Sequence, residues 1–371
     1  MTMRRSLQCC VIRVATCSAS TTVCGHRDKA HNAQARRIGR SVRIGRCQGD
    51  MFLYRPVGRV PDVTPQTFLA ELEPIAGRLL DRHLATTKEW FPHELVPYAR
   101  GRDFGRGYQW CADDCELGGA VLPEAVRSAL FVNLLTEDNL PYYFRDIERM
   151  FSMDGAFGTW NRRWTAEEGR HSIVIRDYLT ATRAVDPVEL ERARMAQVCA
   201  GEVPTPSSPL LGVIYVSLQE LATRIAHRNT GKLIGDRSGY EVMARVAADE
   251  NLHYLFYRDL ASAAIELNPS EMVIAIEEVV RTFAMPGTGI PGFDRHSAAI
   301  ARAGIYDATI LHEQVLVPVI VNHWGIEQLE KLTAAAEQAR DALLKRLDRL
   351  GQLARNLAAR AERRQVAAAP S

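Results

Sequence analysis

A pattern of metal-ligand residue types that occurs twice, Glu-x-x-His, constrains this chain more than any other feature. Its copies are Glu168 with His171 and Glu250 with His253, each in a helical segment and each with an acidic residue directly before the glutamate. Residues three apart in a helix project from the same face, so each pair can hold one metal ion. A single pair is often solvated surface, but two copies favour one common explanation, a metal site.

A single glutamate precedes each copy at almost the same distance. Glu137 lies 31 residues before Glu168, and Glu220 lies 30 residues before Glu250. One glutamate from each of two helices, plus a Glu-x-x-His from each of two more, is the ligand set of the ferritin-like di-iron bundle. Oxygen-rich ligation with some nitrogen favours iron or manganese over zinc. The predicted ligands of two iron ions are Glu137, Glu168, His171, Glu220, Glu250 and His253.

Composition and charge restrict the function further. The chain has 371 residues, 47% hydrophobic and 24% charged, as in an ordinary globular protein. Its net charge of +2 offers no electrostatic basis for nucleic-acid binding. The most apolar run, residues 315–321, is interrupted by Pro318 and falls short of the roughly 18 residues of a membrane span. We therefore expect no nucleic-acid partner and no membrane span, and any lipid substrate must arrive on a soluble carrier.

The first 50 residues differ from the rest of the chain. They contain nine arginines, only two acids and five of the eight cysteines. Three alternatives are open: a targeting segment, a metal knuckle that uses Cys24 and His26, and an upstream extension with Met51 as the true start. We favour the extension and expect residues 1–55 to be a disordered N-terminal segment or a wrongly assigned start. The three remaining cysteines are too few for a disulfide framework, which fits a reducing compartment, and we expect a cytoplasmic protein.

From about Val63 the chain has the periodicity of helices. Thr64 and Pro65 form a helix start, with a capping hydroxyl followed by proline at the first helical position. Residues 90–123 contain prolines and glycines without a sustained period, which predicts a loop. Almost nothing alternates as a strand would, so the predicted fold class is all-α. Further helices are expected near residues 124–151, 157–183, 188–199, 209–230, 237–266 and 270–284.

The connections fit a ferritin-like four-helix bundle with additional helices. The Glu168 and Glu220 segments are 52 residues apart, which leaves room for the long crossover that such a bundle needs. We expect one bundle domain over residues 56–325 and a C-terminal amphipathic helix and tail over residues 326–371. Acidic residues are mixed through the polar face of that helix, which favours packing on protein over binding to a membrane.

Pro141 predicts an irregularity beside one of the ligands. It lies four residues after Glu137 and has no N–H to donate to the carbonyl of that residue, so the helix should bend or bulge there. A proline that merely ends a helix is disfavoured, because Tyr142, Phe144 and Ile147 continue the apolar pattern. Such irregularities are common beside functional residues.

The predicted ligands lie in four longer motifs that resemble one known family. From about residue 65 to 325 the chain resembles the soluble acyl-[acyl-carrier-protein] desaturases, the di-iron enzymes of plant plastids and some bacteria. Two positions depart from the plant pattern, Gly169 in place of Asn and Leu252 in place of Arg, and neither is a ligand position. The motifs that carry the resemblance are Thr136-Glu137-Asp138-Asn139-Leu140-Pro141, Trp164-Thr165-Ala166-Glu167-Glu168-Gly169-Arg170-His171, Tyr215-Val216-Ser217-Leu218-Gln219-Glu220-Leu221-Ala222-Thr223 and Ala248-Asp249-Glu250-Asn251-Leu252-His253.

The resemblance implies roles for further residues besides the same six iron ligands. It places the hydroxyl of Thr223 close to the oxygen-binding face. It also has Asp249 orient His171 and link that imidazole to Trp90 on an electron route. The alternatives are a Thr223 hydroxyl that bonds back to its own helix and a Trp90 side chain that only anchors a loop.

The activity that the resemblance implies is the O₂-dependent introduction of a cis double bond into a fatty acyl chain, in fatty acid biosynthesis. The implied partners are acyl carrier protein, a ferredoxin-type electron donor and a second copy of the chain in a homodimer. A narrow apolar tunnel should present the acyl chain to the irons. Two alternatives stay open: a ferritin-like protein that oxidises or stores iron, and a di-iron oxygenase that hydroxylates its substrate. Candidates for the tunnel lining, each of which could equally be plain core, are Phe131, Leu135, Ile175, Leu211, Ile214 and Leu218.

Overall fold

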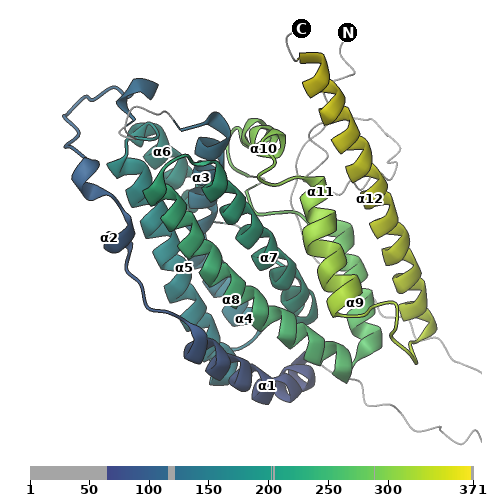
Figure 1. Cartoon of the computed structure of the whole chain (residues 1–371). Helices are drawn as coiled ribbons and strands as arrows, with labels where there is room; N and C mark the ends of the chain where they lie inside the picture. Colours follow the sequence, from purple (N-terminus) through teal and green to yellow (C-terminus); the bar gives the residue numbers. More distant parts are fainter. Residues whose placement is uncertain (1–64, 116–121, 202, 204, 288, 369–371) are drawn as a thin grey trace, which may run out of the picture.

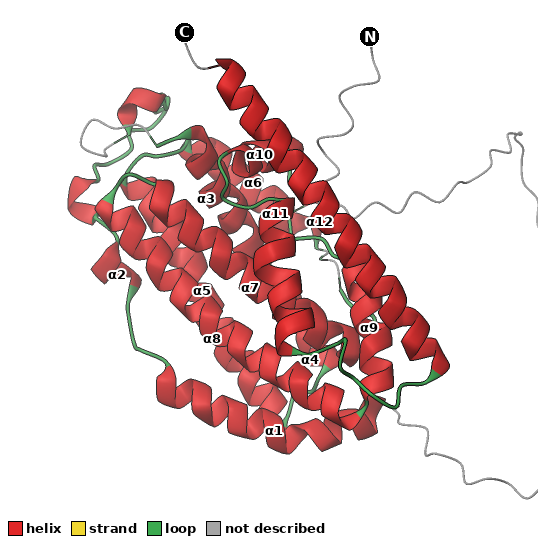
Figure 2. Ribbon diagram, turned by 45° about the vertical axis from the view of Figure 1, so that its right-hand side comes forward, coloured by secondary structure: helices red, strands yellow, loops and turns green. Residues whose placement is uncertain are grey.

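The computed structural model describes residues 65–368 apart from 116–121, 202, 204 and 288. The predictions made for residues 1–55 therefore lie outside the described residues. All regular structure in the described part is helical, without a strand, which confirms the predicted all-α class (Figures 1 and 2). No helix in this part of the chain is both long and apolar enough to cross a bilayer.

Four helices form the central bundle. They are α3 (Glu124–Glu137), α5 (Gly155–Ala181), α7 (Pro209–Leu233) and α8 (Arg237–Leu267). Helix α3 packs on α5, α5 on α8, α8 on α7 and α7 on α3, so the four enclose a common interior (Figure 1). Each carries one of the predicted single glutamates or one of the Glu-x-x-His pairs, which brings all four motifs to the same interior.

Local sequence determines where the bundle helices begin. Ser208 caps α7 by accepting a hydrogen bond from the Leu211 N–H, and a proline follows at the first helical position. Asp236 caps α8 by accepting from the Gly239 N–H. Between the two helices Gly235 has φ of +69°, a conformation that favours glycine, so the chain can reverse within a few residues. Side-chain caps of this kind stabilise a helix by about 1 kcal/mol each.

The predicted irregularity beside Glu137 is confirmed as a break in the helix. Helix α3 ends at Glu137, two residues form a turn, and α4 (Leu140–Met150) begins with Pro141 in its first turn. The expected single helix near residues 124–151 is therefore two helices, because proline cannot donate the hydrogen bond that would continue α3. The break places Glu137 at a helix terminus, facing the bundle interior.

The remaining N-terminal elements surround the bundle. Helix α1 (Pro65–Thr86) packs on α5 and α8, and α6 (Pro187–Ala200) lies within the long connection between α5 and α7. The segment predicted as loop contains short helical turns, namely α2 (Pro92–Leu95), η2 (Tyr98–Arg100) and η3 (Ala112–Asp114).

The C-terminal elements cover the other side of the bundle. After α9 (Pro269–Thr282) come α10 (Phe293–Arg302), α11 (Ala308–Ile310), the π-helix η4 (Leu311–His323) and the long α12 (Ala334–Ala368), which runs along α9 (Figures 1 and 2). The last helix begins at Ala334 and not near Ile326, because Gly325 and Lys331 have positive φ and interrupt the helical path. Leu343 and Leu347 are buried in the same apolar cluster as α9, so α12 is a packing helix.

Gly158 allows the chain to turn tightly into α5, which yields a first prediction. A Cβ atom at this position would lie 2.1 Å from the carbonyl oxygen of Met153, a backbone atom that cannot move aside. We expect Gly158→Ala to destabilise the protein by about 2–3 kcal/mol, lowering its thermal midpoint by roughly 3–5 °C. In Gly77→Ala on α1 the new Cβ would meet only Ala156 Cβ at 3.8 Å, so the midpoint should stay the same or rise. Equal midpoints for the two variants would contradict the prediction.

Candidate metal centre

The structure brings all six predicted ligands together inside the bundle. Glu137 comes from α3, the first Glu-x-x-His pair from α5, Glu220 from α7 and the second pair from α8. Their ligand atoms form two groups, within each of which the atoms lie within 4.8 Å of one another. The first group is Glu137, Glu168, His171 and Glu250, and the second is Glu168, Glu220, Glu250 and His253.

Glu168 and Glu250 are shared between the two groups. Oε2 of Glu168 lies 2.9 Å from Nδ1 of His171, and its Oε1 lies 2.9 Å from Nδ1 of His253. Oε1 of Glu250 lies 3.6 Å from Nδ1 of His171, and its Oε2 lies 3.9 Å from Nδ1 of His253. Each of these carboxylates thus presents one oxygen to each half of the site, which is the arrangement needed to bridge two metal ions. Glu137 and Glu220 each belong to one half.

Both histidines have the same orientation. Each presents Nδ1 to the ligand cluster and directs Nε2 outward to an acid that is not in the cluster. His171 Nε2 lies 3.5 Å from Oδ2 of Asp249, and His253 Nε2 lies 2.9 Å from Oε2 of Glu167. A carboxylate can only accept a hydrogen bond when ionised, so it favours a proton on Nε2 and leaves the Nδ1 lone pair for a metal ion.

The predicted contact from His171 through Asp249 to Trp90 is present. The indole N–H of Trp90 donates to Oδ2 of Asp249 over 2.8 Å, the same oxygen that faces His171. The indole ring is buried and lies parallel to the His171 ring, with the centroids 6.5 Å apart. Arg170 stacks over the indole and also approaches Asp249. The carboxylate of Asp249 is thereby fixed from three sides.

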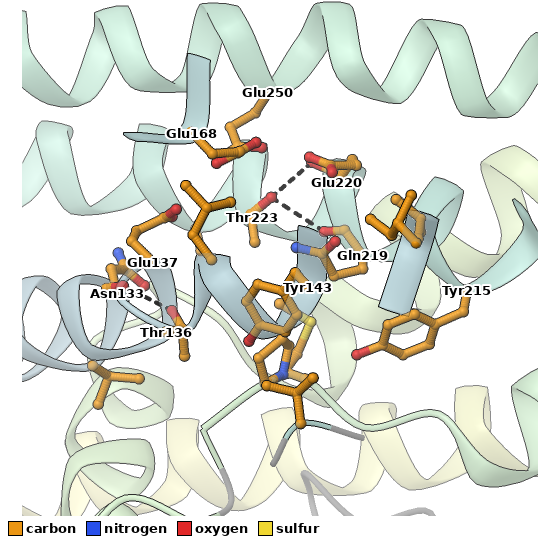
Figure 3. A pocket seen from close by; sticks show the side chains of 18 of the residues that line it. Asn133, Thr136, Glu137, Tyr143, Glu168, Tyr215, Gln219, Glu220, Thr223 and Glu250 are labelled. Atoms are coloured by element: carbon orange, nitrogen blue, oxygen red, sulfur yellow. Dashed lines mark hydrogen bonds between the residues drawn. The ribbon is translucent and has the colours of Figure 1, made fainter. Parts of the chain in front are cut away.

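The hydroxyl of Thr223 bonds back to its own helix, as the alternative role for this residue predicts. Its hydroxyl donates to the carbonyls of Gln219 and Glu220, over 3.2 and 3.0 Å, on its own helix. It also lines the pocket beside the carboxylates, between Glu168 and Tyr143 (Figure 3). Its proposed place near the oxygen-binding face remains a prediction.

The electrostatics of the cluster favour cations. Burial and the nearby Glu168 raise the pKa of Glu137 well above its usual value, and burial and Glu250 do the same for the pKa of Glu220. Four carboxylates cannot all be charged in a dry interior without compensation, and two divalent cations would neutralise them. Three ligand atoms are buried without a hydrogen-bond partner among the described residues: Glu220 Oε2, Glu250 Oε2 and His253 Nδ1. The donor set and these unpaired atoms fit two iron ions.

Sequence reasoning missed several side chains that contact the ligands from outside. Trp164 donates its indole N–H to Oε1 of Glu220 over 3.2 Å, and His227 lies with Nε2 3.4 Å from Oε1 of Glu250. Burial alone would raise the pKa of Glu250, but the nearby imidazole of His227 helps to hold that pKa well below its usual range. Glu167 could have been found from the sequence, because an acid precedes the glutamate in both Glu-x-x-His copies. His227 offered no comparable pattern.

A largely apolar cavity reaches the carboxylates (Figure 3). It is bounded by faces of α3, α4 and α7, by α10 and by the chain around Ile305 and Tyr306. None of the six residues suggested for the tunnel lining belongs to it; all six are buried in the core clusters instead. The apolar residues that do line the cavity include Val132, Leu140, Ile147, Met150, Val216 and Ile300.

Comparison with known proteins gives a consistent result. The family model for fatty acid desaturases matches residues 65–370. DesA1 of Mycobacterium tuberculosis, whose name assigns it provisionally to the acyl-[acyl-carrier-protein] desaturases, is 42% identical over 291 residues, 76% of this chain and 84% of DesA1. A chloroplastic stearoyl-[acyl-carrier-protein] 9-desaturase of Arabidopsis thaliana is 32% identical over 63% of this chain and 65% of its own.

The fold has a counterpart among solved structures. The X-ray structure of DesA2 from Mycobacterium tuberculosis, also named provisionally as an acyl-ACP desaturase, matches with a TM-score of 0.59 and 26% sequence identity. The match covers 73% of this chain and 98% of DesA2, and it confirms the ferritin-like bundle with additional helices. The chain belongs to the fatty acid desaturase family, among the acyl-[acyl-carrier-protein] desaturases.

Proposed function

We propose that this chain is an O₂-dependent acyl-[acyl-carrier-protein] desaturase that uses two iron ions to introduce a cis double bond into a carrier-bound fatty acyl chain, in fatty acid biosynthesis. The observation that carries the proposal is the junction of the apolar cavity with the shared carboxylates, since Glu168 and Glu250 both line that cavity. A largely apolar cavity suits a fatty acyl chain, whose methylene groups would then lie beside the metal centre.

In this proposal the protein residues bind the metal ions, orient the ligands and shield the site from water. Two irons held by the six ligands would supply the oxidant that removes hydrogen from an unactivated methylene pair. Five of the six ligands are buried and Glu137 is partly buried, so the surrounding helices exclude most bulk water from the site. Glu167 forms a hydrogen bond with the outer nitrogen of His253, and Asp249 faces the outer nitrogen of His171 at 3.5 Å, which orients the two rings. The cavity walls select which methylene pair reaches the site.

The reaction balances with an external reductant. Two C–H bonds on adjacent carbons break and a C=C bond forms, which releases two electrons and two protons. O₂ takes up these electrons and protons together with two electrons from the donor and two protons from solvent, and leaves as two waters. We propose a ferredoxin-type donor, with Trp90, Asp249 and His171 as its route inward; their contacts support this path. The homodimer stays a prediction from the resemblance.

Two other functions share this ligand set and are separated by one experiment. The iron-loaded protein is incubated with acyl-[acyl-carrier-protein], a ferredoxin-type reductant and O₂, and the acyl chain is analysed by mass spectrometry. We expect loss of two hydrogen atoms per chain, and no change when iron or the reductant is omitted. Gain of one oxygen atom would mean hydroxylation, and an unchanged acyl chain with accumulating iron would mean storage; either result contradicts the proposal.

A further inference from the structure

A second chain of buried polar contacts lies behind His253, on the side of the metal centre that Trp90 does not reach. Oε2 of Glu167 lies 2.9 Å from Nε2 of His253 and 3.0 Å from Nε2 of His83. The other oxygen of Glu167 accepts a hydrogen bond from Arg163 over 2.6 Å. Glu167 and both imidazoles are almost completely buried. The proposed function uses Glu167 as the acid behind His253 but assigns no role to His83.

This arrangement repeats the one around His171. Glu167 and Asp249 each directly precede a shared carboxylate ligand, and each accepts a hydrogen bond from an arginine four residues earlier, Arg163 and Arg245. Each acid contacts the outer nitrogen of the histidine on the other helix. Each also accepts from one aromatic ring N–H supplied by α1 or the segment that follows it, His83 in one half and Trp90 in the other. The two halves of the site therefore have similar outer contacts, with an imidazole in one half where the other has an indole. They differ further in that Asp249 also accepts from Arg170 and lies 3.5 Å from its histidine, against 2.9 Å for Glu167.

We infer that His83 is a positioning residue for the half of the metal centre that contains His253. Its Nε2–H and Arg163 together hold Glu167 so that Oε2 accepts from Nε2 of His253. That hydrogen bond leaves Nδ1 of His253 free for a metal ion.

The N–H of His83, and not only its ring, is required by this role. The ring packs edge-on against Trp160, with centroids 4.9 Å apart at 87°, a contact that another aromatic side chain could make. Nδ1 of His83 is buried without a hydrogen-bond partner among the described residues, so Nε2 makes the one polar contact of the side chain there. Without that N–H, Glu167 would lose a donor and could rotate away from His253.

The test compares two substitutions of nearly equal length, His83→Gln and His83→Met, because only glutamine keeps an N–H at its tip. Stepwise anaerobic binding of Fe(II) to the metal-free protein is measured by calorimetry. We expect His83→Met to weaken one of two binding steps by about 10–100-fold and leave the other unchanged, as for other outer partners of metal ligands. His83→Gln should restore most of the lost affinity. Thermal unfolding of the metal-free variants checks the fold, and His83→Phe, which keeps the ring, replaces methionine should that variant not fold.

Mössbauer spectra of protein loaded with ⁵⁷Fe(II) identify which half is affected. His83→Met should shift the signal of one iron, and Trp90→Phe should shift the signal of the other.

The inference is wrong if both binding steps of His83→Met stay within about twofold of the unsubstituted protein, if both fall equally, or if glutamine is no better than methionine. The inference rests on the proposed metal centre, but different results would refute the inference and the proposed desaturase function. A protein that binds two irons with no His83 effect refutes only this inference, whereas one that binds two irons but leaves the acyl chain intact refutes only the desaturase.

Discussion

Glu168→Gln and Glu250→Gln should each abolish binding of both metal ions, whereas Glu137→Gln and Glu220→Gln should each abolish only one. The reason is geometric, because Glu168 and Glu250 belong to both ligand groups and the other two glutamates belong to one each. Glutamine keeps the shape of the side chain but loses the charge and one of two metal-binding oxygens. We expect affinity to fall by more than about 100-fold at each affected site, since even the outer partners of ligands contribute 10–100-fold. Iron content per chain after loading and desalting is the measurement.

The metal-free variants provide the control for folding. Burial and Glu250 raise the pKa of Glu220, so the charged form of this side chain is unfavourable in the metal-free bundle. Glu220→Gln should therefore unfold at the same or a higher temperature than the unsubstituted protein when both lack metal. If all four substitutions removed the same amount of iron, the shared roles of Glu168 and Glu250 would be refuted.

The ligands could be predicted from the sequence because their spacing is a local property of helices. Glu168 and His171 lie one helical turn apart, and the nearly equal distances from Glu137 and Glu220 to the two pairs reveal two similar halves. The break after Glu137 was likewise predictable, since it depends on the chemistry of one residue, Pro141. The structure brings the six side chains into one cluster and breaks the helix after Glu137, while their role as iron ligands stays a prediction.

The cavity lining could not be predicted in the same way. Phe131 and Leu218 stand on the ligand helices and are apolar, but both face the core instead of the cavity. The actual lining depends on which faces of α3 and α7 remain uncovered once α4 and α10 have packed. Residues such as Phe293 and Ile305 enter from far along the chain, and no periodicity on the ligand helices indicates that they do.

His83 illustrates a second limit of sequence reasoning. In sequence it is a single histidine near the end of α1, and such a residue is most often surface or ordinary core. His83 precedes Glu167 by 84 residues in the sequence, and the two side chains meet because α1 packs on α5 and α8. The acid before each Glu-x-x-His pair could be read from the sequence, whereas the ring that holds the acid is supplied by tertiary packing.

Ala226→Phe should block turnover of a long acyl chain while leaving the metal centre intact. Ala226 lines the cavity on α7, one turn beyond Thr223 and one turn before Asn229, whose amide donates to the carbonyl of Ile305. A phenyl ring here would occupy part of the cavity through which the proposed acyl chain must pass. Because displacement of a reacting group by about 1 Å can cost 10²-fold, we expect kcat/KM on the long-chain carrier substrate to fall by at least about 100-fold.

Ala244→Phe is the matched control for this blockage. Ala244 is exposed on α8 and does not line the acyl cavity, so the same substitution there should leave turnover and iron content close to those of the unsubstituted protein. Iron content should also be unchanged in Ala226→Phe, because Ala226 contributes no ligand atom. Loss of turnover with both irons retained would place the acyl chain in this cavity. Full turnover by Ala226→Phe would mean that the chain reaches the metal centre by another path, and the proposed substrate site would have to be abandoned even if the irons remain in place.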